Sequence, residues 1–462
     1  MMLKKAILSL RENYGQAMAV TAPLGSVVST TTAAISFAGS SIIFTTLLSL
    51  LASGLWIYTL SLYTRKVASA GGYYSFNYCA WRSKKFAFLE ALTEVFAYSL
   101  LNAVNAISAY LMVQFILDVL DLQQYSWLST LVLLLSLLYP TLISLIDIKK
   151  LLGIIVTVSA TLEAVFLILL FVISLQGGLK ISLLVPHFDN LSDLGTAFLL
   201  TTVSIAGAGA ATYLGEETKK PHENVTKGMW MALGIGGLSI LLGTYALIAL
   251  WSGSLESLAS SPQPLLSEVL RFGTLPLIFT IILAINSLLS SNIGTTVGAS
   301  RILFNLAREN AAPKIFLITN KHKQPIVSTV VVGIISGIFT IIPILYLGIY
   351  QAFVEVAAVE SILWILGRVF DGFGVPIFYI FRLRKIKIQY IIIPVIASSI
   401  NSWGIITSLV SVDIPQILML ITFITTVLVW YLSKASKGFP GSLIVNEFNE
   451  IVKVEEYFKN NA

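Results

Sequence analysis

Residues 207–228, GAGAATYLGEETKKPHENVTKG, run from small apolar residues through two glutamates into a cluster of lysines with a proline. Glycine lowers the stability of a helix, and charged side chains are costly inside hydrocarbon. The stretch therefore predicts a membrane helix whose backbone opens at Gly207 and Gly209. Glu216 and Glu217, followed by the lysines, indicate where this helix leaves the bilayer.

The composition predicts a membrane protein before any motif is considered. Of the 462 residues, 56% are hydrophobic and 11% are charged, and the mean hydropathy is +0.87. A soluble domain of this length exposes far more charge. Apolar runs of about twenty residues recur, and a helix of that length spans roughly 30 Å of hydrocarbon. The runs are continuously apolar, unlike barrel strands, so we expect an all-α polytopic membrane protein.

The apolar runs predict 12 transmembrane helices. Their ranges are 16–38, 40–63, 86–117, 127–146, 151–175, 194–215, 228–252, 274–306, 326–346, 351–380, 389–410 and 415–433. Basic residues gather in alternate loops, beginning with Lys4 and Lys5 and ending with Lys434. The positive-inside rule then places both termini in the cytoplasm, with an N-terminal segment at 1–15 and a tail at 434–462. The net charge of +6 reports this topology and implies no nucleic-acid partner.

Two of the predicted helices are interrupted at corresponding places. In the first helix, TAPLGSVVSTTTA at residues 21–33, Pro23 removes a backbone donor and Gly25 adds flexibility. In the sixth helix, SIAGAGAA at residues 204–211 places its two glycines at mid-membrane depth. Breaks that lie five helices apart are expected from two repeats of opposite orientation.

The repeats predict where a ligand binds. The halves would be residues 16–175 and 194–380, with two added helices in 389–433. After a break, free amides face an anion, and before a break, free carbonyls face a cation. A zwitterion such as an amino acid satisfies both. The alternative is that the glycines and the proline only permit close helix packing.

Three separated motifs resemble those of one transporter superfamily. They are GAGAATYLGEETKKPHENVTKG at 207–228, NSLLSSNIGTTVGASRILFNLARENAAPKIF at 286–316 and RKVASAGGYYSF at 65–76. Together they resemble the amino acid–polyamine–organocation (APC) superfamily. The resemblance implies a leucine-transporter-type fold, with a five-plus-five inverted repeat and two extra helices. It also implies a permease for amino acids or related amines that works by alternating access.

The resemblance also implies which residues contact substrate. The segment that would meet the substrate carboxylate consists of Ala22, Pro23, Leu24, Gly25, Ser26 and Val27. The residues that would offer backbone to the amine are Ile205, Ala206, Gly207 and Gly209. The usual Gly-Ser-Gly of the family reads Leu-Gly-Ser here, which shifts the register of the first set. Ala208 stands where many relatives carry an aromatic gate.

Glu163, in the middle of the predicted fifth helix, is the first candidate for ion coupling. In many relatives the matching position is a lysine or glutamate beside a cation site formed by helices 1, 5 and 8. Burial favours the neutral form of a carboxyl group, so Glu163 is a candidate proton carrier. On the eighth helix, Ser287, Ser291 and Thr295 recur every fourth residue and form one hydroxyl stripe. These groups either bind a cation or only bond within the protein.

The third helix carries a polar face. Asn102 and Asn105 lie deep in the membrane and are candidates for lining the substrate route. Glu90 and Glu94 lie nearer the cytoplasmic end and are expected to pair with basic loop residues.

The tenth and sixth helices supply candidates for a gate. On the tenth helix, Arg368 and Asp371 are expected to form a structural ion pair, which leaves Glu360 unpaired as a candidate for gate or coupling. Glu216 and Glu217 either pair structurally at the helix end or form ion pairs that differ between inward and outward states.

A transporter is favoured over other classes. Three histidines and one cysteine, Cys79 in a predicted loop, form no metal-ligand cluster or nucleophile motif, so we expect no enzyme, no cofactor and no metal. An amino acid or amine exchanger and a non-transporting amino-acid sensor of the same fold are the alternatives. The expected partners are a small-molecule substrate, a coupling proton (sodium is less favoured) and the lipid of the cell membrane. The oligomeric state is left open.

Overall fold

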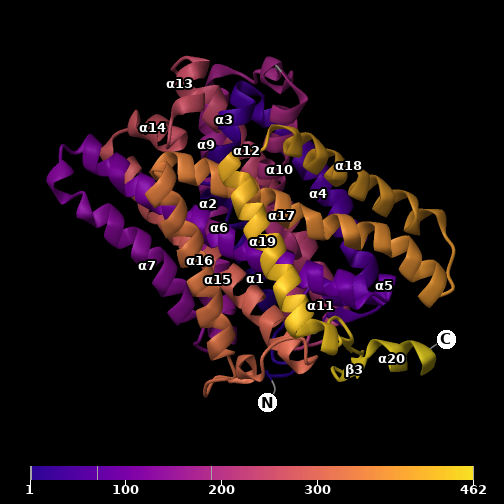
Figure 1. Cartoon of the computed structure of the whole chain (residues 1–462). Coiled ribbons are helices and arrows are strands. Elements are labelled where there is room, and N and C mark those ends of the chain that lie inside the picture. The colour runs from indigo at the N-terminus through magenta and orange to yellow at the C-terminus, as the bar shows by residue number, and fades with distance from the viewer. Residues whose placement is uncertain (1–2, 70, 189, 461–462) are drawn as a thin grey trace.

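The computed structural model describes residues 3–69, 71–188 and 190–460, and most of these residues lie in helices (Figure 1). Within these residues, ten helices are long and apolar enough to cross a membrane. The prediction of a polytopic all-α membrane protein is confirmed at this level. The predicted first span falls on three short helices, and the predicted tenth falls on a long helix that carries four charged residues.

The first helix is interrupted where Pro23 predicts it. The elements are α1 (Leu10–Thr21), α2 (Pro23–Val28), α3 (Thr30–Ala38) and α4 (Ile42–Thr64). Between α1 and α2, Ala22 adopts the left-handed conformation with φ 40° and ψ 71°. Pro23 can follow directly because it occupies the first position of α2, where no backbone donor is needed.

The remaining long helices follow the predicted ranges within a few residues at most ends. They are α6 (Lys84–Val119), α7 (Trp127–Ile143), α9 (Thr157–Ser174), α10 (Leu191–Ala206), α11 (Pro221–Ala232), α12 (Leu238–Leu250), α15 (Thr274–Arg308), α16 (Ile326–Leu347), α17 (Ile349–Ile377), α18 (Ile392–Ser408) and α19 (Ile414–Ser433). A 3₁₀ helix, η6 (Gly207–Leu214), continues α10, and π-helical turns lie at η3 (Leu151–Val156), η7 (Leu233–Gly237) and η9 (Phe378–Arg382). Short helices connect these elements: α5 (Tyr74–Trp81), α8 (Ile148–Lys150), α13 (Leu255–Ser260), α14 (Pro264–Leu270) and α20 (Val454–Asn460).

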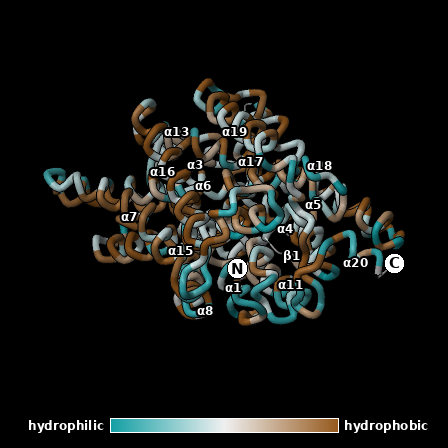
Figure 2. Tube along the Cα trace, turned by 60° about the horizontal axis from the view of Figure 1, so that its bottom comes forward, coloured by the Kyte–Doolittle hydropathy of each residue, from teal (hydrophilic) through white to brown (hydrophobic). Residues whose placement is uncertain are grey.

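The long helices divide into a buried centre and an apolar periphery. The most apolar 18-residue stretch of the α10–η6 segment is 94% buried, whereas the corresponding stretch of the segment that contains α7 is only 22% buried. The outer surface of α7 exposes a run of leucines, including Leu134, Leu138 and Leu142. Figure 2 shows hydrophobic residues along α7 and hydrophilic residues around α8 and α11. Such a surface is stable against lipid and would be unstable in water.

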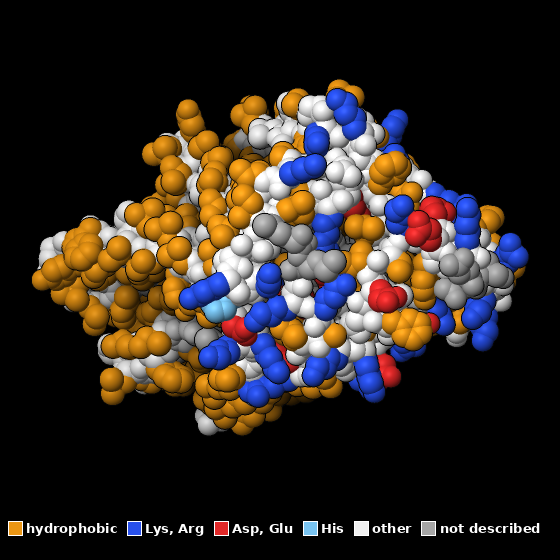
Figure 3. Space-filling model, turned by 90° about the horizontal axis from the view of Figure 1, so that it is seen from below, with side chains coloured by type: hydrophobic (Ala, Val, Ile, Leu, Met, Phe, Trp, Pro, Cys, Tyr) orange, Lys and Arg blue, Asp and Glu red, His pale blue; other side chains and the backbone are white. Residues whose placement is uncertain are grey.

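Both chain ends lie at one end of the helix bundle (Figure 1). Seen from that end, Lys and Arg side chains gather over the face (Figure 3). The C-terminal segment, predicted only as a tail, folds back onto this face. It contributes β2 (Leu443–Val445) and β3 (Ile451–Lys453) to an antiparallel sheet with β1 (Ala68–Ser69), in which Ala68 pairs with Val445.

Candidate functional site

The interruption of helix 1 leaves backbone groups that are partly satisfied by side chains. The Ser26 hydroxyl donates to the Thr21 carbonyl oxygen at 2.7 Å, which caps the end of α1. The Gly25 amide donates to Ser287 Oγ on α15 at 2.7 Å. A Cβ on Gly25 would lie 2.8 Å from that same oxygen, so only glycine fits the contact. The predicted carboxylate-binding segment, Ala22 to Val27, is buried throughout.

Glu163 is joined to this interruption through the Ser287 hydroxyl. Its carboxylate accepts hydrogen bonds from Ser287 Oγ and, at 3.0 Å, from Ser159 Oγ. Asn286 Nδ2 donates to Ser159, so α15 holds the glutamate from two positions. The structure therefore places Glu163, Ser287 and Gly25 in one continuous chain of hydrogen bonds across α9, α15 and α2.

The predicted hydroxyl stripe on α15 divides between two surroundings. Ser287 faces Glu163, whereas Thr295 Oγ1 donates to Asn102 Oδ1 on α6 at 2.5 Å. Ser291 is buried between them on the same helix. Spacing on a helix was therefore insufficient to predict one shared site, because α15 contacts α9 with one part of the stripe and α6 with the other.

Asn102 and Asn105 belong to a network of side-chain amides. Asn105 Nδ2 donates to Asn292 Oδ1 at 2.9 Å, and Asn102 Nδ2 donates to Thr296 Oγ1 and Ser336 Oγ, each at 3.2 Å. The two asparagines thus connect α6 to α15 and α16. Their amide groups are engaged with protein in this structure, so they stabilise helix packing beside the predicted site.

The sixth helix does not open at its glycines as the sequence predicts. After Ala206 it tightens from an α-helix into η6 and continues without a gap. A Cβ on Gly207 would overlap the Thr21 backbone and lie 2.6 Å from Thr21 Cα, and one on Gly209 would overlap the Tyr73 hydroxyl. Both glycines are therefore needed for close packing, because a side chain at Gly207 would push η6 away from the interruption of helix 1 and one at Gly209 would displace Tyr73. Ile205 and Ala208, also in the predicted set, are buried on either side.

The carbonyl released by this tightening is bound by an arginine. Arg368 Nη2 on α17 donates to the Ala206 carbonyl oxygen at 3.0 Å. The expected Arg368–Asp371 ion pair is wrong, since the described residues contain no such pair. Asp371 and Glu360 are both fully buried. The Asp371 carboxyl group lies within hydrogen-bonding reach of that of Glu90, whereas no described group forms a hydrogen bond with the Glu360 carboxyl group.

The acids at the start of α6 also turn inward. Glu94 accepts hydrogen bonds from the Tyr74 amide at 3.1 Å and from the Tyr213 hydroxyl. Glu90 lies against α17, where a Cβ on Gly367 would be 3.4 Å from Glu90 Oε1. The prediction that Glu90 and Glu94 pair with basic loop residues is wrong, because the segment leading into α5 and the helix α17 cover them.

Two buried ion pairs join the end of η6 to α15. Arg301 Nε donates to Glu217 Oε2 at 2.6 Å, and both side chains are 1% exposed. Arg308 binds Glu216 through both terminal nitrogens, at 2.7 and 3.1 Å. The acids at the helix exit therefore pair with arginines of the predicted eighth helix. The neighbouring Lys219 and Lys220 stay exposed.

Both termini reinforce this region. The backbone amides of Ile7 and Leu8 donate to the Glu217 carbonyl oxygen at 2.8 and 2.9 Å. From the C-terminal segment, Asn449 Nδ2 donates to the Thr218 carbonyl oxygen at 2.6 Å. Residues from both ends of the chain thus hold the backbone of the segment that carries these glutamates.

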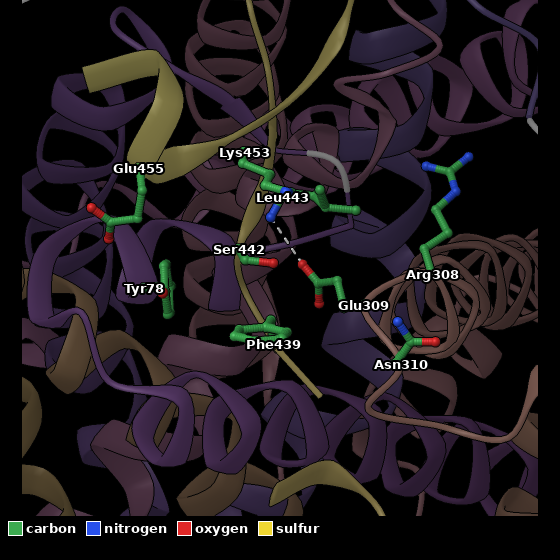
Figure 4. Close-up of a pocket in the computed structure, with 9 residues that line it drawn as sticks. All are labelled: Tyr78, Arg308, Glu309, Asn310, Phe439, Ser442, Leu443, Lys453 and Glu455. Carbon is green, nitrogen blue, oxygen red and sulfur yellow. Dashed lines mark hydrogen bonds between the residues drawn. The ribbon is translucent and has the colours of Figure 1, made fainter. Parts of the chain in front are cut away.

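A cavity of about 300 Å³ lies between the end of α15 and the C-terminal segment (Figure 4). On its wall, Glu309 accepts hydrogen bonds from the amides of Gly441 and Leu443 at 2.9 and 3.0 Å and from the Tyr74 hydroxyl at 3.1 Å. Burial raises the pKa of Glu309 to about 8 despite these bonds, which favour the ionised form. Sequence reasoning missed Glu309, because nothing in its local sequence indicates that a distant segment folds over it.

Cys79 also differs from its predicted surroundings. It lies in α5 instead of a loop and is completely buried. Burial raises the pKa of its thiol far above the ordinary value, so it is an unreactive packing residue. Among the residues that the structure places, no group of three or more potential metal ligands occurs.

Comparison with known proteins supplies the family. No curated protein matches the chain closely. The family model described as amino acid permease matches residues 16–448, which includes both irregular helices, Glu163 and the buried ion pairs. That range covers most of the chain, so this protein belongs to the amino acid permease family, as its sequence motifs predict.

Proposed function

We propose that this protein is a secondary active transporter that moves amino acids or related amines across the cell membrane by alternating access. Membership of the amino acid permease family and the ten long apolar helices support a membrane transporter. The proposed fold is of the leucine-transporter type, with 12 membrane helices and cytoplasmic termini. Its repeats are 16–175 and 194–380, and two further helices lie in 389–433.

The observation that carries the proposal is the contact between the two irregular helices. Gly207, at the start of η6, packs directly on the backbone of Thr21, at the end of α1. The segments are remote in sequence, yet both depart from α-helical geometry where they meet. Unpaired backbone groups inside a membrane are tolerated where protein or ligand binds them. The paired irregularities are therefore the proposed substrate site.

Glu163 is the proposed proton carrier. When Glu163 is ionised, it accepts a hydrogen bond from the Ser287 hydroxyl. The Ser287 oxygen can then accept a hydrogen bond from the Gly25 amide. When protonated, the carboxyl group can donate, and the Ser287 hydroxyl is free to turn. Proton binding at Glu163 would thus change the hydrogen bonding of the helix 1 interruption, which is the coupling that a proton symporter requires.

The ion pairs at the exit of η6 are the proposed inner gate. With Glu217 bound to Arg301 and Glu216 bound to Arg308, η6 is fixed to α15 and the predicted substrate residues are buried. Opening toward the cytoplasm would require these pairs to separate. Substrate binding would have to favour that separation through differential contacts in the two states.

Uptake into liposomes tests the function and the coupling together. We expect saturable entry of a labelled amino acid that an inward proton gradient stimulates severalfold. Glu163→Gln should abolish the stimulation and still permit exchange against preloaded substrate. Glu355→Gln is the matched control, because Glu355 is another buried glutamate. It lies near the start of α17 and accepts hydrogen bonds from Gln351 and from Gln416 on α19.

The alternatives give different results in the same assay. Stimulation by a sodium gradient instead of a proton gradient would contradict the role of Glu163. Entry that depends wholly on preloaded substrate would indicate an exchanger. Binding of an amino acid without any flux would indicate a sensor of the same fold.

A further inference from the structure

Arg368 is a buried cation with spare hydrogen-bonding capacity. Its side chain is 1% exposed, and Nη2 is bound to the Ala206 carbonyl oxygen. Nε and Nη1 have no hydrogen-bond partner in the part of the chain that the structure describes. Arg368 forms no ion pair within the described chain, and a buried guanidinium without a directly bound anion is costly, so the surroundings favour binding of a carboxylate.

The groups around Arg368 are also donors that lack acceptors. The Arg368 guanidinium lies over the Trp56 ring at 5.3 Å, and the Trp56 and Tyr73 rings are 6.1 Å apart. Tyr73 contacts Tyr213, which contacts Tyr98, at 5.4 and 5.3 Å between ring centres. Trp56 Nε1 has no partner among the described residues, and the hydroxyls of Tyr73 and Tyr98 approach only other hydroxyls, those of Thr212 and Tyr213. Helix α17, helix α4, the segment before α5 and helix α6 thus bring donors into one region walled by aromatic rings.

Nearby acids do not fill this place. Glu360, eight residues before Arg368 on α17, interacts with it electrostatically, but the described residues show no ion pair or hydrogen bond between the two side chains. Glu94 is already bound by the Tyr213 hydroxyl and by backbone amides. Asp371 forms no ion pair with Arg368 within the described chain.

We propose that Arg368 binds a second carboxylate on the substrate, so that this permease takes acidic amino acids. The inference rests on the proposed function, and it adds the substrate class. A carboxylate matches the paired donors of a guanidinium in a bidentate arrangement, and Trp56 and the two tyrosines can donate to it as well. A neutral side chain would leave these donors unpaired.

The contact with Ala206 gives the subsite a second consequence. The Ala206 carbonyl is among the groups that helix 6 would offer to the substrate amine, and Arg368 holds it in this structure. A carboxylate that draws the guanidinium toward itself releases that carbonyl for the ammonium group. An acidic amino acid thus supplies both the anion for Arg368 and the cation that replaces it at Ala206.

Competition and counterflow in liposomes test the subsite. The probes are aspartate and glutamate, compared with asparagine and glutamine. We expect the acidic pair to be preferred by at least tenfold in KM. Arg368→Gln should remove that preference, and Arg368→Lys should keep part of it. Trp56→Phe keeps an aromatic side chain but removes the indole N–H, so it should raise the KM for acidic substrates severalfold. Arg382→Gln is the control, since Arg382 is a buried arginine bound to Glu455 near the C-terminus.

The outcomes separate the subsite from the general function. If neutral amino acids are carried while acidic ones neither enter nor compete, the subsite is wrong and the permease stands. If no amino acid of either class binds or moves in the folded wild type, the proposed function fails as well. An Arg368→Gln protein that elutes as folded protein but keeps the acidic preference would also overturn the subsite. If that variant does not fold, unchanged selectivity in Trp56→Phe and Arg368→Lys would do the same.

Discussion

At the scale of single residues, glycines decide how closely the irregular helices approach. Gly25 lets Ser287 reach the backbone of α2, and Gly207 lets η6 lie on the end of α1. In both cases the neighbour that a side chain would meet is fixed, as backbone or as a hydroxyl already bound to Glu163. A substitution at these glycines therefore changes more than helix propensity, because the added methyl group has no space.

Gly207→Ala should therefore damage the site. The added methyl would overlap the backbone of Thr21 and Val20, which cannot move as a flexible side chain could. We expect a loss of about 1–3 kcal/mol in unfolding free energy and at least tenfold slower uptake. Thermal unfolding and liposome uptake measure the two effects. Gly54→Ala in α4 is the control, since a Cβ there meets nothing within 4 Å, and equal behaviour of both variants would contradict the packing role.

At the scale of elements, the C-terminal segment and α15 form one unit at the face that carries both termini. The sheet pairs β1 with β2. Glu309, at the end of α15, accepts hydrogen bonds from the amides of Gly441, just before β2, and Leu443, the first residue of β2. Arg382 binds Glu455 through two hydrogen bonds of 2.9 Å. The segment therefore lies beside the ion pairs of the proposed inner gate, connected to Arg308 by the adjacent Glu309.

Docking of the C-terminal segment should weaken as the pH rises. Burial raises the pKa of Glu309 from its ordinary 4.5 to about 8. Between pH 4.5 and about pH 8, the Glu309 carboxyl group is therefore protonated in the docked state and ionised in the undocked state. The docked state is then most stable below pH 4.5 and loses stability as the pH rises toward about 8. Hydrogen exchange at residues 441–445, corrected for intrinsic rates, should show at least about tenfold more opening at pH 8.5 than at pH 5.5.

Glu309→Gln fixes the group in a neutral form and should remove most of this pH dependence. Glu450→Gln, which alters another acid of the same segment, should leave it in place. Equal pH profiles in the wild type and Glu309→Gln would show that another group controls docking.

At the scale of the whole molecule, burial and charge give a consistent orientation. The most buried long segment is α10–η6, and the exposed apolar surface lies on α7 and other outer helices. The face rich in lysine and arginine is at the end of the bundle where both termini lie. The positive-inside rule predicts that this face is cytoplasmic, as proposed above. Because Cys79 is buried with a raised thiol pKa, the natural protein has no reactive cysteine to confuse labelling.

Cysteine labelling checks this orientation. In intact cells, Lys180→Cys should react with a membrane-impermeant maleimide, and Lys321→Cys should react only after the membrane is permeabilised. Both positions are exposed and lie at opposite ends of the predicted helices. The wild type, with Cys79 alone, should stay unlabelled in both conditions. The reverse pattern would invert the proposed topology.

The sequence by itself determined the membrane class, the approximate helix ranges, the interruption at Pro23 and the family. These features are local: apolar run length, the missing donor of proline and a contiguous motif decide them. It also singled out Glu163, which the structure joins to Gly25 through Ser287.

Only the tertiary structure decided which polar groups meet. It divided the α15 stripe between Glu163 and Asn102, bound Arg368 to Ala206 instead of Asp371, and folded the C-terminal segment over Glu309. In each case the partner lies on another helix or far along the chain. The spacing of residues on one helix gives the direction of a side chain, but the neighbour that it meets depends on how the helices pack, because buried polar groups bind whichever partner the packing brings within reach.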